Sequence, residues 1–361
     1  MFTRTLRLCR AHWLACSILF LLTLGIGVNA VAFRHAWAMS HFVEGGVRTR
    51  EPIALSFVEK ASVLVTGVRL PKPINTRSPA DEGLEFETLH FSSTDGVDLE
   101  SWYIPTENPR GIILFFHGYG SCKMAHLTSA SILRGKGYDC LLVDERGAGG
   151  SGGNFTTLGF LEAKDVAGAV QFARRLKPGL PCILLGTSMG AAASLRAVAI
   201  EKVNVDAVIV ECPFDSLLAT TKNRFSMMGL PTVPLAEFVS FLGRRCNFGD
   251  NTFAHRPMDY AKEVDVPTLQ LHGEKDTRVT LTQLPGLRGA CWPQGVRAST
   301  ARTRILLAEP PTAWSEAIET FSTHISIRNK ILRCRGPSSD RVAQAGRIAH
   351  NREHVESCRL L

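Results

Sequence analysis

A serine between two glycines carries the sharpest chemical signal in this sequence. Ser188 lies in residues 184–190, LLGTSMG, where an apolar run with strand character meets an alanine-rich, helix-like segment. A nucleophilic serine needs a tight turn from strand to helix to expose its hydroxyl group, and Gly186 and Gly190 supply the space for that turn. The pattern predicts Ser188 as the nucleophile of an acyl-transfer reaction.

A second segment could stabilise the oxyanion that such a reaction forms. Residues 113–120, ILFFHGYG, run from an apolar strand into a His-Gly turn. The backbone amides of Tyr119 and Met189 are predicted to form an oxyanion hole, in which one donor typically contributes about 3 to 4 kcal/mol to the transition state. His117 is interpreted as a structural residue of this turn and not as a base.

A third segment offers the acid of a catalytic triad. Residues 269–279, LQLHGEKDTRV, place Asp276 just past a predicted strand. A carboxylate at that position can orient an imidazole and balance its charge. The alternative interpretation of Asp276 is a solvated aspartate in a turn.

The elements that must position these residues alternate regularly. Residues 160–176 carry alanine and valine at the i, i+3, i+4, i+7 spacing of an amphipathic helix. Continuous apolar strands between such helices predict an α/β fold with a doubly wound, mainly parallel sheet, covered on both faces and opened by an antiparallel hairpin. The predicted strands are residues 85–91, 99–104, 112–116, 140–143, 182–185, 207–210 and 268–271.

A helical cap is predicted where the alternation stops, at about residues 215–264. This stretch carries phenylalanines and methionines together with the helix breakers Pro231 and Pro234. The full division predicted from the sequence is a basic N-terminus at 1–12, an apolar helix at 13–33, a linker or extension at 34–83, the α/β domain at 84–325 and a basic, disordered tail at 326–361.

The apolar helix is predicted to anchor the chain in a membrane. Residues 13–33 contain 21 residues without a charge, and about 20 apolar residues span a bilayer as a helix. A cleaved signal peptide, cut near residues 30–32 (AVA), and a buried core helix are the alternatives. Arginines at positions 4, 7 and 10 favour a cytoplasmic N-terminus, so the chain is predicted to be a single-pass protein with an extracytoplasmic catalytic domain.

Charge and cysteine content exclude several classes of protein. The chain has 361 residues, 45% of them hydrophobic, and a net charge of +8. From Arg328 to the end of the sequence there are eight basic residues and three acidic ones, so most of the excess positive charge lies in the tail. A nucleic-acid-binding body is therefore not expected. The ten cysteines form no C-x-x-C pair, and neither a disulfide framework nor a metal site is predicted.

Taken together, these motifs resemble the α/β-hydrolase superfamily, in particular its lysophospholipase-like and serine-aminopeptidase-like branch. The resemblance implies Ser188 as nucleophile, Asp276 as acid, the amides of Tyr119 and Met189 as oxyanion hole, and no cofactor or metal. It runs from about residue 85 to residue 276 and depends on residues 117–120 (HGYG), 144–149 (DERGAG) with Ser151, 186–190 (GTSMG) and 272–276 (HGEKD) followed by Arg278 and Val279.

One glycine-rich stretch matches the sequence pattern of a nucleotide-binding motif. Residues 147–152 match G-x-G-x-x-G after a strand, but residues 154–157 separate this loop from the next helical pattern. A dinucleotide-binding loop leads directly into its helix. The stretch instead resembles the Asp-x-Arg-Gly-x-Gly loop of the hydrolases.

The resemblance fails at the third catalytic residue. Residues 284–304 contain no histidine, although the family carries its catalytic histidine after the last strand. Three explanations stay open: a shifted reading frame in this stretch, recruitment of His324 as the base, or a catalytically inactive relative. Losing one triad member typically leaves only about 10³ to 10⁴-fold catalysis over water.

Two functions are therefore expected from the sequence. The first is a membrane-anchored serine hydrolase that cleaves a small carboxylic ester or acyl substrate through an acyl intermediate on Ser188, an amide or thioester being the less favoured bond. The second is a catalytically inactive, membrane-anchored binding protein on the same fold. The missing histidine favours the second, and the intact Gly-x-Ser-x-Gly favours the first.

Overall fold

The computed structural model describes residues 2–50, 54–227, 229, 232–243, 254–271, 318 and 321. The chain divides into two compact units, Met1–Ser315 and Glu316–Leu361. The second unit contributes Ile318 and Phe321 to the described residues, and both have helical backbone. The fold below is that of the first unit.

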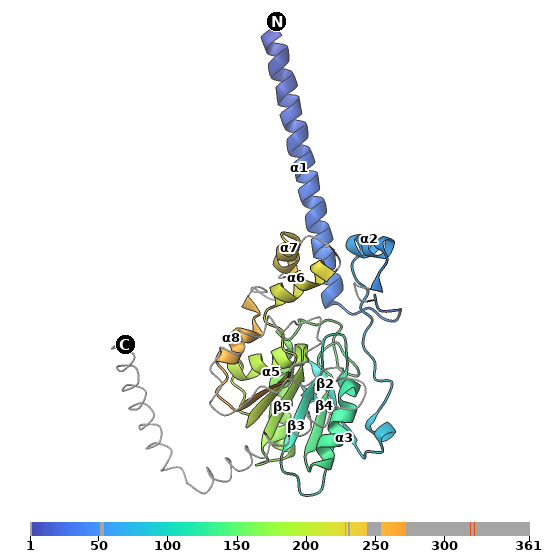
Figure 1. Ribbon diagram of the computed structural model, residues 1–361, viewed down its shortest axis with the longest axis vertical. Coiled ribbons are helices and arrows are strands. Elements are labelled where there is room, and N and C mark those ends of the chain that lie inside the picture. The colour runs from blue at the N-terminus through green and yellow to red at the C-terminus, as the bar shows by residue number, and fades with distance from the viewer. Residues whose placement is uncertain are drawn as a thin grey trace, which may run out of the picture. The chain divides into compact units, whose positions relative to one another are not determined.

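In the described part of this unit, seven strands form a sheet at its centre (Figure 1). Its order is β1-β2-β4-β3-β5-β6-β7. The first two strands form the predicted antiparallel hairpin, β2 is also antiparallel to β4, and the remaining neighbours are parallel. The strands are β1 (Glu87–Ser92), β2 (Asp98–Ile104), β3 (Ile112–Phe116), β4 (Asp139–Val143), β5 (Cys182–Thr187), β6 (Ala207–Glu211) and β7 (Thr268–Leu271). All seven predicted strands are confirmed.

Helices cover both faces of the sheet, as alternating side chains of β4 show. Leu141 and Val143 belong to the core shared with α4 (Glu162–Leu176) and α5 (Met189–Ala199). Cys140, which points the other way, places its thiol 3.5 Å from the carbonyl of Ala130 in α3 (Leu127–Gly135). Strand residues buried on both faces are the signature of a parallel sheet between helical layers. The doubly wound α/β fold is confirmed.

Among the described residues of the range predicted for the cap there are three helices: α6 (Leu217–Met227), α7 (Leu235–Gly243) and α8 (Pro257–Lys262). Helix α7 packs against the end of the N-terminal helix α1 (Phe2–Ser40), and α6 packs against α7. Their shared apolar cluster contains Ala32, Ala36, Phe225, Ala236 and Val239. The segment of α1 from His12 to Ser40 is long enough and apolar enough to cross a membrane. The helix continues past its predicted end at residue 33.

The segment predicted as a linker, residues 34–83, contacts the body at several points. Residues 34–40 are the last turns of α1, and Thr156 donates its amide to the Ser40 carbonyl at 2.8 Å. Further along, the Asn75 side chain donates to Asp144 at 2.7 Å. The described segment also holds α2 (Phe57–Thr66), which begins with a capping box between Ser56 and Glu59.

Candidate active site

Ser188 lies at the turn between β5 and α5 in a backbone conformation that side chains rarely adopt. Its φ is 53° and its ψ is −101°, a strained region that such turns keep only when the surrounding structure holds them. Two backbone hydrogen bonds hold this one: Ser188 donates its amide to Glu211 at 2.8 Å, and its carbonyl accepts from Ala192 at 3.1 Å. The turn therefore presents the Ser188 side chain at the carboxyl end of the parallel strands.

The flanking glycines are required by close backbone contacts. A side-chain carbon on Gly186 would lie 2.3 Å from the carbonyl oxygen of Gly190, and one on Gly190 would lie 2.3 Å from that of Phe116. Real Cβ atoms do not approach other atoms so closely. Strand β3 thus lies directly against the turn, and the spacing read from the sequence has a steric cause.

The His-Gly turn lies beside the serine, as the sequence predicts. A carbon placed on Gly118 would lie 3.8 Å from the Ser188 Cβ atom. Ser121 donates to the Gly118 carbonyl at 3.1 Å and closes a β-turn in which Gly120 has a φ of 64°. The closing bond does not use the amide of Tyr119, the second residue of the turn. Met189 is the first residue of α5, so its amide has no partner within the helix.

His117 is held as a buried structural histidine. Its Nε2 atom accepts a hydrogen bond from the Glu145 amide at 3.1 Å, so the proton lies on Nδ1, which donates to the Gly118 carbonyl at 3.0 Å. Burial lowers its pKa below the ordinary value. A neutral ring with both nitrogens engaged cannot accept the proton of Ser188. This agrees with the interpretation from the sequence.

The side chain of Tyr119 joins this turn to the N-terminal helix. No sequence motif predicted this contact. Its hydroxyl donates to the Met39 carbonyl at 2.6 Å. The guanidinium of Arg224 lies 5.5 Å from the centre of its ring, and Arg48 donates to the Gly120 carbonyl at 2.9 Å. Segments far apart in the sequence therefore fix the candidate oxyanion turn.

The glycine-rich loop that follows β4 is lined with carboxylates. Asp144 accepts hydrogen bonds from the amides of Lys123 at 2.7 Å and Gly150 at 3.1 Å. A carbon on Gly150 would lie 2.2 Å from the carboxylate of Glu100. The loop amides that would bind a pyrophosphate group already donate within the protein, those of Gly147, Gly149 and Gly152 to the carbonyls of Gly152, Pro73 and Asp98. The structure thus gives a physical reason for setting the dinucleotide interpretation aside.

Buried ion pairs fix the same loop beneath the site. The Lys123 ammonium, fully buried, lies 2.5 Å from both Asp144 and Glu100. Arg146 pairs with Asp165 and with Asp95, each at 2.7 Å. Buried charges paired this way make the loop rigid, because breaking one pair leaves an uncompensated charge.

The predicted acid and base, Asp276 and His324, both lie outside the described residues. Among the described histidines, His126 and His255 are fully buried and hydrogen-bonded to the carbonyls of Phe116 and Leu158. Burial lowers the pKa of each to about 4. Neither ring is available to act as a base at Ser188.

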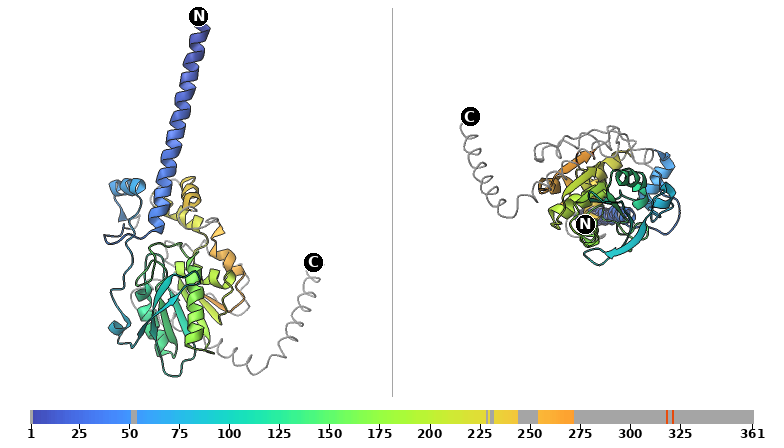
Figure 2. Two further views of the ribbon diagram at one scale, coloured as in Figure 1. Left: turned by 180° about the vertical axis from the view of Figure 1, so that it is seen from behind. Right: turned by 90° about the horizontal axis from the view of Figure 1, so that it is seen from below.

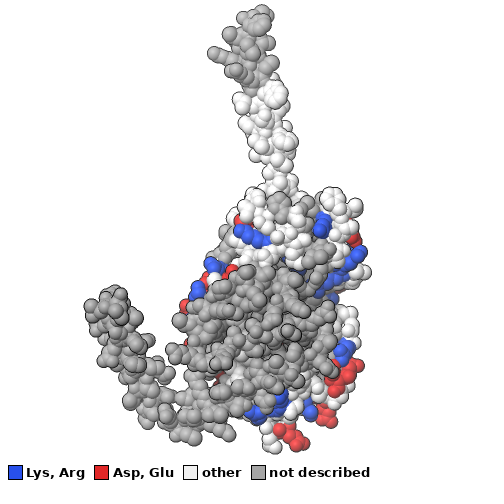
Figure 3. Space-filling model, viewed as in Figure 1, with Lys and Arg blue, Asp and Glu red and all other residues white. Residues whose placement is uncertain are grey.

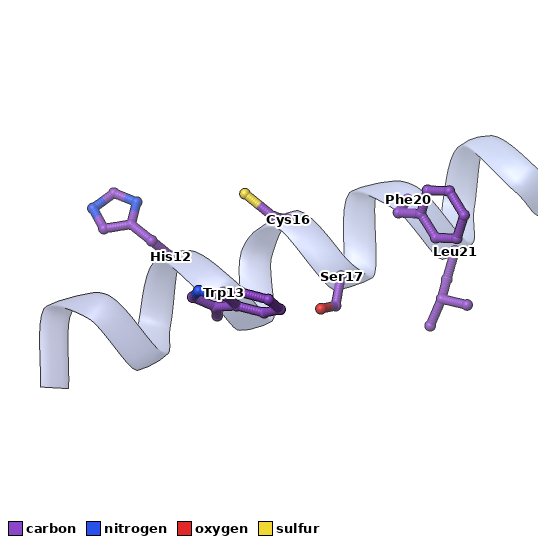
Figure 4. Close-up of a pocket in the computed structure, with 6 residues that line it drawn as sticks. All are labelled: His12, Trp13, Cys16, Ser17, Phe20 and Leu21. Carbon is purple, nitrogen blue, oxygen red and sulfur yellow. The ribbon is translucent and has the colours of Figure 1, made fainter. Parts of the chain in front are cut away.

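A hollow of about 690 Å³ lies away from this chemistry, on the surface of α1 (Figure 4). All its lining residues come from that one helix: His12, Trp13, Cys16, Ser17, Phe20 and Leu21. A binding cavity for a small molecule is normally enclosed by several elements. The hollow is therefore a groove between side chains of an exposed helix and not a candidate active site.

Comparison with known proteins finds a matching family and two relatives of similar sequence. Residues 107–232 match the family described as serine aminopeptidase, S33. The uncharacterized protein YqkD of Bacillus subtilis (strain 168) is 25% identical over 207 residues, 56% of this chain and 67% of that protein. The uncharacterized protein YfhR of Salmonella typhimurium (strain LT2) is 31% identical over 121 residues, 32% of this chain. The match spans 41% of YfhR, less than half of its length.

A solved structure has the same arrangement of strands and helices. The esterase PF2001 of Pyrococcus furiosus superimposes with a TM-score of 0.59 at 21% identity, covering 70% of this chain and 96% of that one. At this identity the likeness is one of fold. It leaves the reaction of the present chain to be argued from its own residues.

Proposed function

We propose that this chain, which has the α/β-hydrolase fold and whose residues 107–232 match the family described as serine aminopeptidase, S33, is a serine hydrolase that cleaves carboxylic esters through an acyl intermediate on Ser188. The observation that carries the proposal is the turn at Ser188, with its φ of 53° and its two obligatory glycines. A protein that used the fold only for binding would have no need to maintain this strained conformation. The alternative, an inactive binding protein, is therefore the second candidate.

The proposed reaction uses three groups: the hydroxyl of Ser188, a base, and the amides of Tyr119 and Met189. The Ser188 oxygen attacks the ester carbonyl as a base removes its proton, and the amides of Tyr119 and Met189 stabilise the negative charge that forms on the carbonyl oxygen. The base then protonates the departing alcohol. Water attacks the acyl group by the same route and releases the acid, so no cofactor is consumed.

Asp276 and His324 complete the proposal as acid and base. In this role His324 takes the proton of Ser188, and Asp276 keeps the imidazole in the correct tautomer. Replacement of His324 by Ala or of Asp276 by Asn tests each role separately. A base other than His324 would leave the His324→Ala variant fully reactive.

The same proposal places the protein in a membrane through α1. Residues of this helix from Ala32 onward are part of the folded body: Ala32 and Ala36 are buried against the cap, and Ser40 accepts from Thr156. A cut near residues 30–32 would fall at the edge of this packing. The contacts favour an uncleaved anchor over a cleaved signal peptide.

Covalent labelling by a fluorophosphonate probe tests the nucleophile. The full-length protein in detergent micelles is expected to be labelled, and Ser188→Ala is expected to lose the label. Ser129→Ala, a change on helix α3 away from the turn, serves as control and should label like the original protein. Folded protein that takes up no label would favour the binding function.

A further inference from the structure

We propose that helices α2 and α7 form a surface that lies on the same bilayer that holds α1. The surface consists of the exposed apolar side chains of these two helices and of the α1 residues between them: Phe33, Trp37, Phe57, Val58, Phe238 and Phe241. The inference depends on the membrane anchor of the proposed function and adds a second, peripheral contact with lipid.

The two helices flank the same short stretch of α1. Ala236 and Val239 of α7 pack on Ala32 and Ala36. On the α2 side, Arg34 donates to the Thr66 carbonyl at 2.8 Å. Figures 1 and 2 show α2 and α7 beside the end of α1 that joins the body. Both helices therefore lie where the apolar stretch of α1 ends.

Helix α7 is apolar on two opposite faces. Ala236 and Val239 cover α1, whereas Phe238 and Phe241 point outward, the latter with 54% of its surface exposed. A surface helix of a water-soluble protein carries polar residues on its outer face, so an apolar outer face requires a second apolar partner. Contact with lipid supplies that partner.

Helix α2 shows the same feature at its first turn. Phe57 is 86% exposed and Val58 is 76% exposed. Outside α1, every phenylalanine that is exposed in the described part of the chain, Phe57, Phe238 and Phe241, lies on α2 or α7. Large apolar side chains gathered at one end of a body mark a contact surface.

The position of this surface fits the dimensions of a bilayer. Trp13, 78% exposed, begins the apolar stretch of α1, and Trp37, 48% exposed, lies four residues past its end at Phe33. At 1.5 Å per residue they lie about 36 Å apart, between the thickness of the hydrocarbon core and that of the whole bilayer. Tryptophan favours these two interfaces. Figure 3 shows the described stretch of α1 that leaves the body as white, free of Lys, Arg, Asp and Glu.

One consequence concerns the substrate. Tyr119, whose amide is the candidate oxyanion donor, touches Met39 two residues beyond Trp37. A body that rests on the bilayer through α2 and α7 brings this turn close to the lipid surface. The proposed ester substrate is then an amphiphile that reaches Ser188 from the membrane.

Site-specific photo-crosslinking tests the surface. The photoreactive amino acid p-benzoylphenylalanine replaces Phe57 or Phe241 in the full-length protein, which is reconstituted in nanodiscs of phosphatidylcholine and phosphatidylglycerol. After illumination, intact-protein mass spectrometry measures the fraction that carries a lipid. The same replacement of Leu21 in α1 is the positive control. Ile200, an apolar residue that is 48% exposed at the far end of α5, is the matched negative control.

The possible outcomes test the proposed surface and the proposed membrane anchor independently. Lipid adducts at positions 57 and 241 several-fold above position 200 are expected. Adducts at position 21 with none above background at positions 57 and 241 would overturn the surface and leave the anchor intact. Protein-protein adducts at 57 or 241 in place of lipid would assign these helices to self-association. Failure at position 21 would overturn both the anchor and the surface.

Discussion

The phenolic hydroxyl of Tyr119 donates a hydrogen bond of 2.6 Å to the main-chain carbonyl of Met39. This bond connects the candidate oxyanion turn to the last turn of α1, although 80 residues of sequence separate the two partners. Because the Tyr119 amide belongs to the same residue, the side-chain bond restrains the orientation of the amide. The N-terminal helix is thus a structural part of the candidate site.

We expect Tyr119→Phe to slow the reaction of Ser188 with a fluorophosphonate without abolishing it. The variant keeps the amide, whose loss would cost about 10² to 10³-fold, so a decrease of about tenfold or less is expected. The Met39 carbonyl loses its partner, which costs about 1 to 3 kcal/mol of stability if it stays buried. Labelling rates and thermal unfolding measure the two effects.

Tyr138→Phe is the matched control for this change. Among the described residues the buried hydroxyl of Tyr138 has no hydrogen-bond partner. Its removal should leave the labelling rate unchanged and the stability equal or higher. Equal effects of the two variants on labelling would show that the bond between Tyr119 and Met39 does not restrain the turn.

We expect Gly190→Ala to disrupt the turn at Ser188. The added methyl group would lie 2.3 Å from the Phe116 carbonyl, and overpacking of this kind costs about 1 to 3 kcal/mol or more. Loss of labelling together with a lower melting temperature is the expected result. Gly135→Ala, where no atom lies within 4 Å of the new carbon, should label normally. Normal labelling of Gly190→Ala would contradict the steric argument.

The strands and the turn that contains Ser188 could be predicted from the sequence, because each depends on local pattern. Apolar runs marked all seven strands, and the spacing of Gly186 and Gly190 marked the turn that contains Ser188. The contacts of residues 34–83 could not be predicted. Arg48 reaches Gly120, and Asn75 reaches Asp144, from a segment without regular periodicity, so nothing local indicates their partners.

We expect Lys123→Met to destabilise the fold strongly. The Lys123 ammonium is fully buried between Asp144 and Glu100, and removing one partner of a buried pair typically costs about 3 to 5 kcal/mol. Lys262→Met breaks a pair with Asp259 in which both side chains are about half exposed, and such pairs contribute about 0 to 1 kcal/mol. Denaturant unfolding in micelles compares the two. Similar losses would show that Asp144 finds other compensation.

Glu145 provides a test of pH dependence. It is fully buried, and among the described residues neither of its carboxylate oxygens has a hydrogen-bond partner. Burial raises its pKa well above the ordinary value, and the carboxylates of Glu162 and Asp165 raise it further, while the Arg146 guanidinium lowers it. His117 lies 3.6 Å away but is neutral, as its hydrogen bonds show. We therefore expect Glu145 to be protonated in the folded protein.

Because the pKa of Glu145 is higher in the folded than in the unfolded protein, the folded protein binds more protons between these two pKa values. The contribution of Glu145 to stability is therefore complete below its unfolded pKa and is lost as the pH rises toward its folded pKa. The Glu145→Gln variant keeps the shape of the side chain and stays neutral at every pH. We expect it not to lose this stability as the pH rises. The stability of the original protein minus that of the variant should fall from pH 5 to pH 8, by up to about 1.4 kcal/mol per pH unit. Unfolding of both proteins across this range measures the difference, in which the other titrating groups cancel. A difference independent of pH would mean that Glu145 is ionised in the folded state.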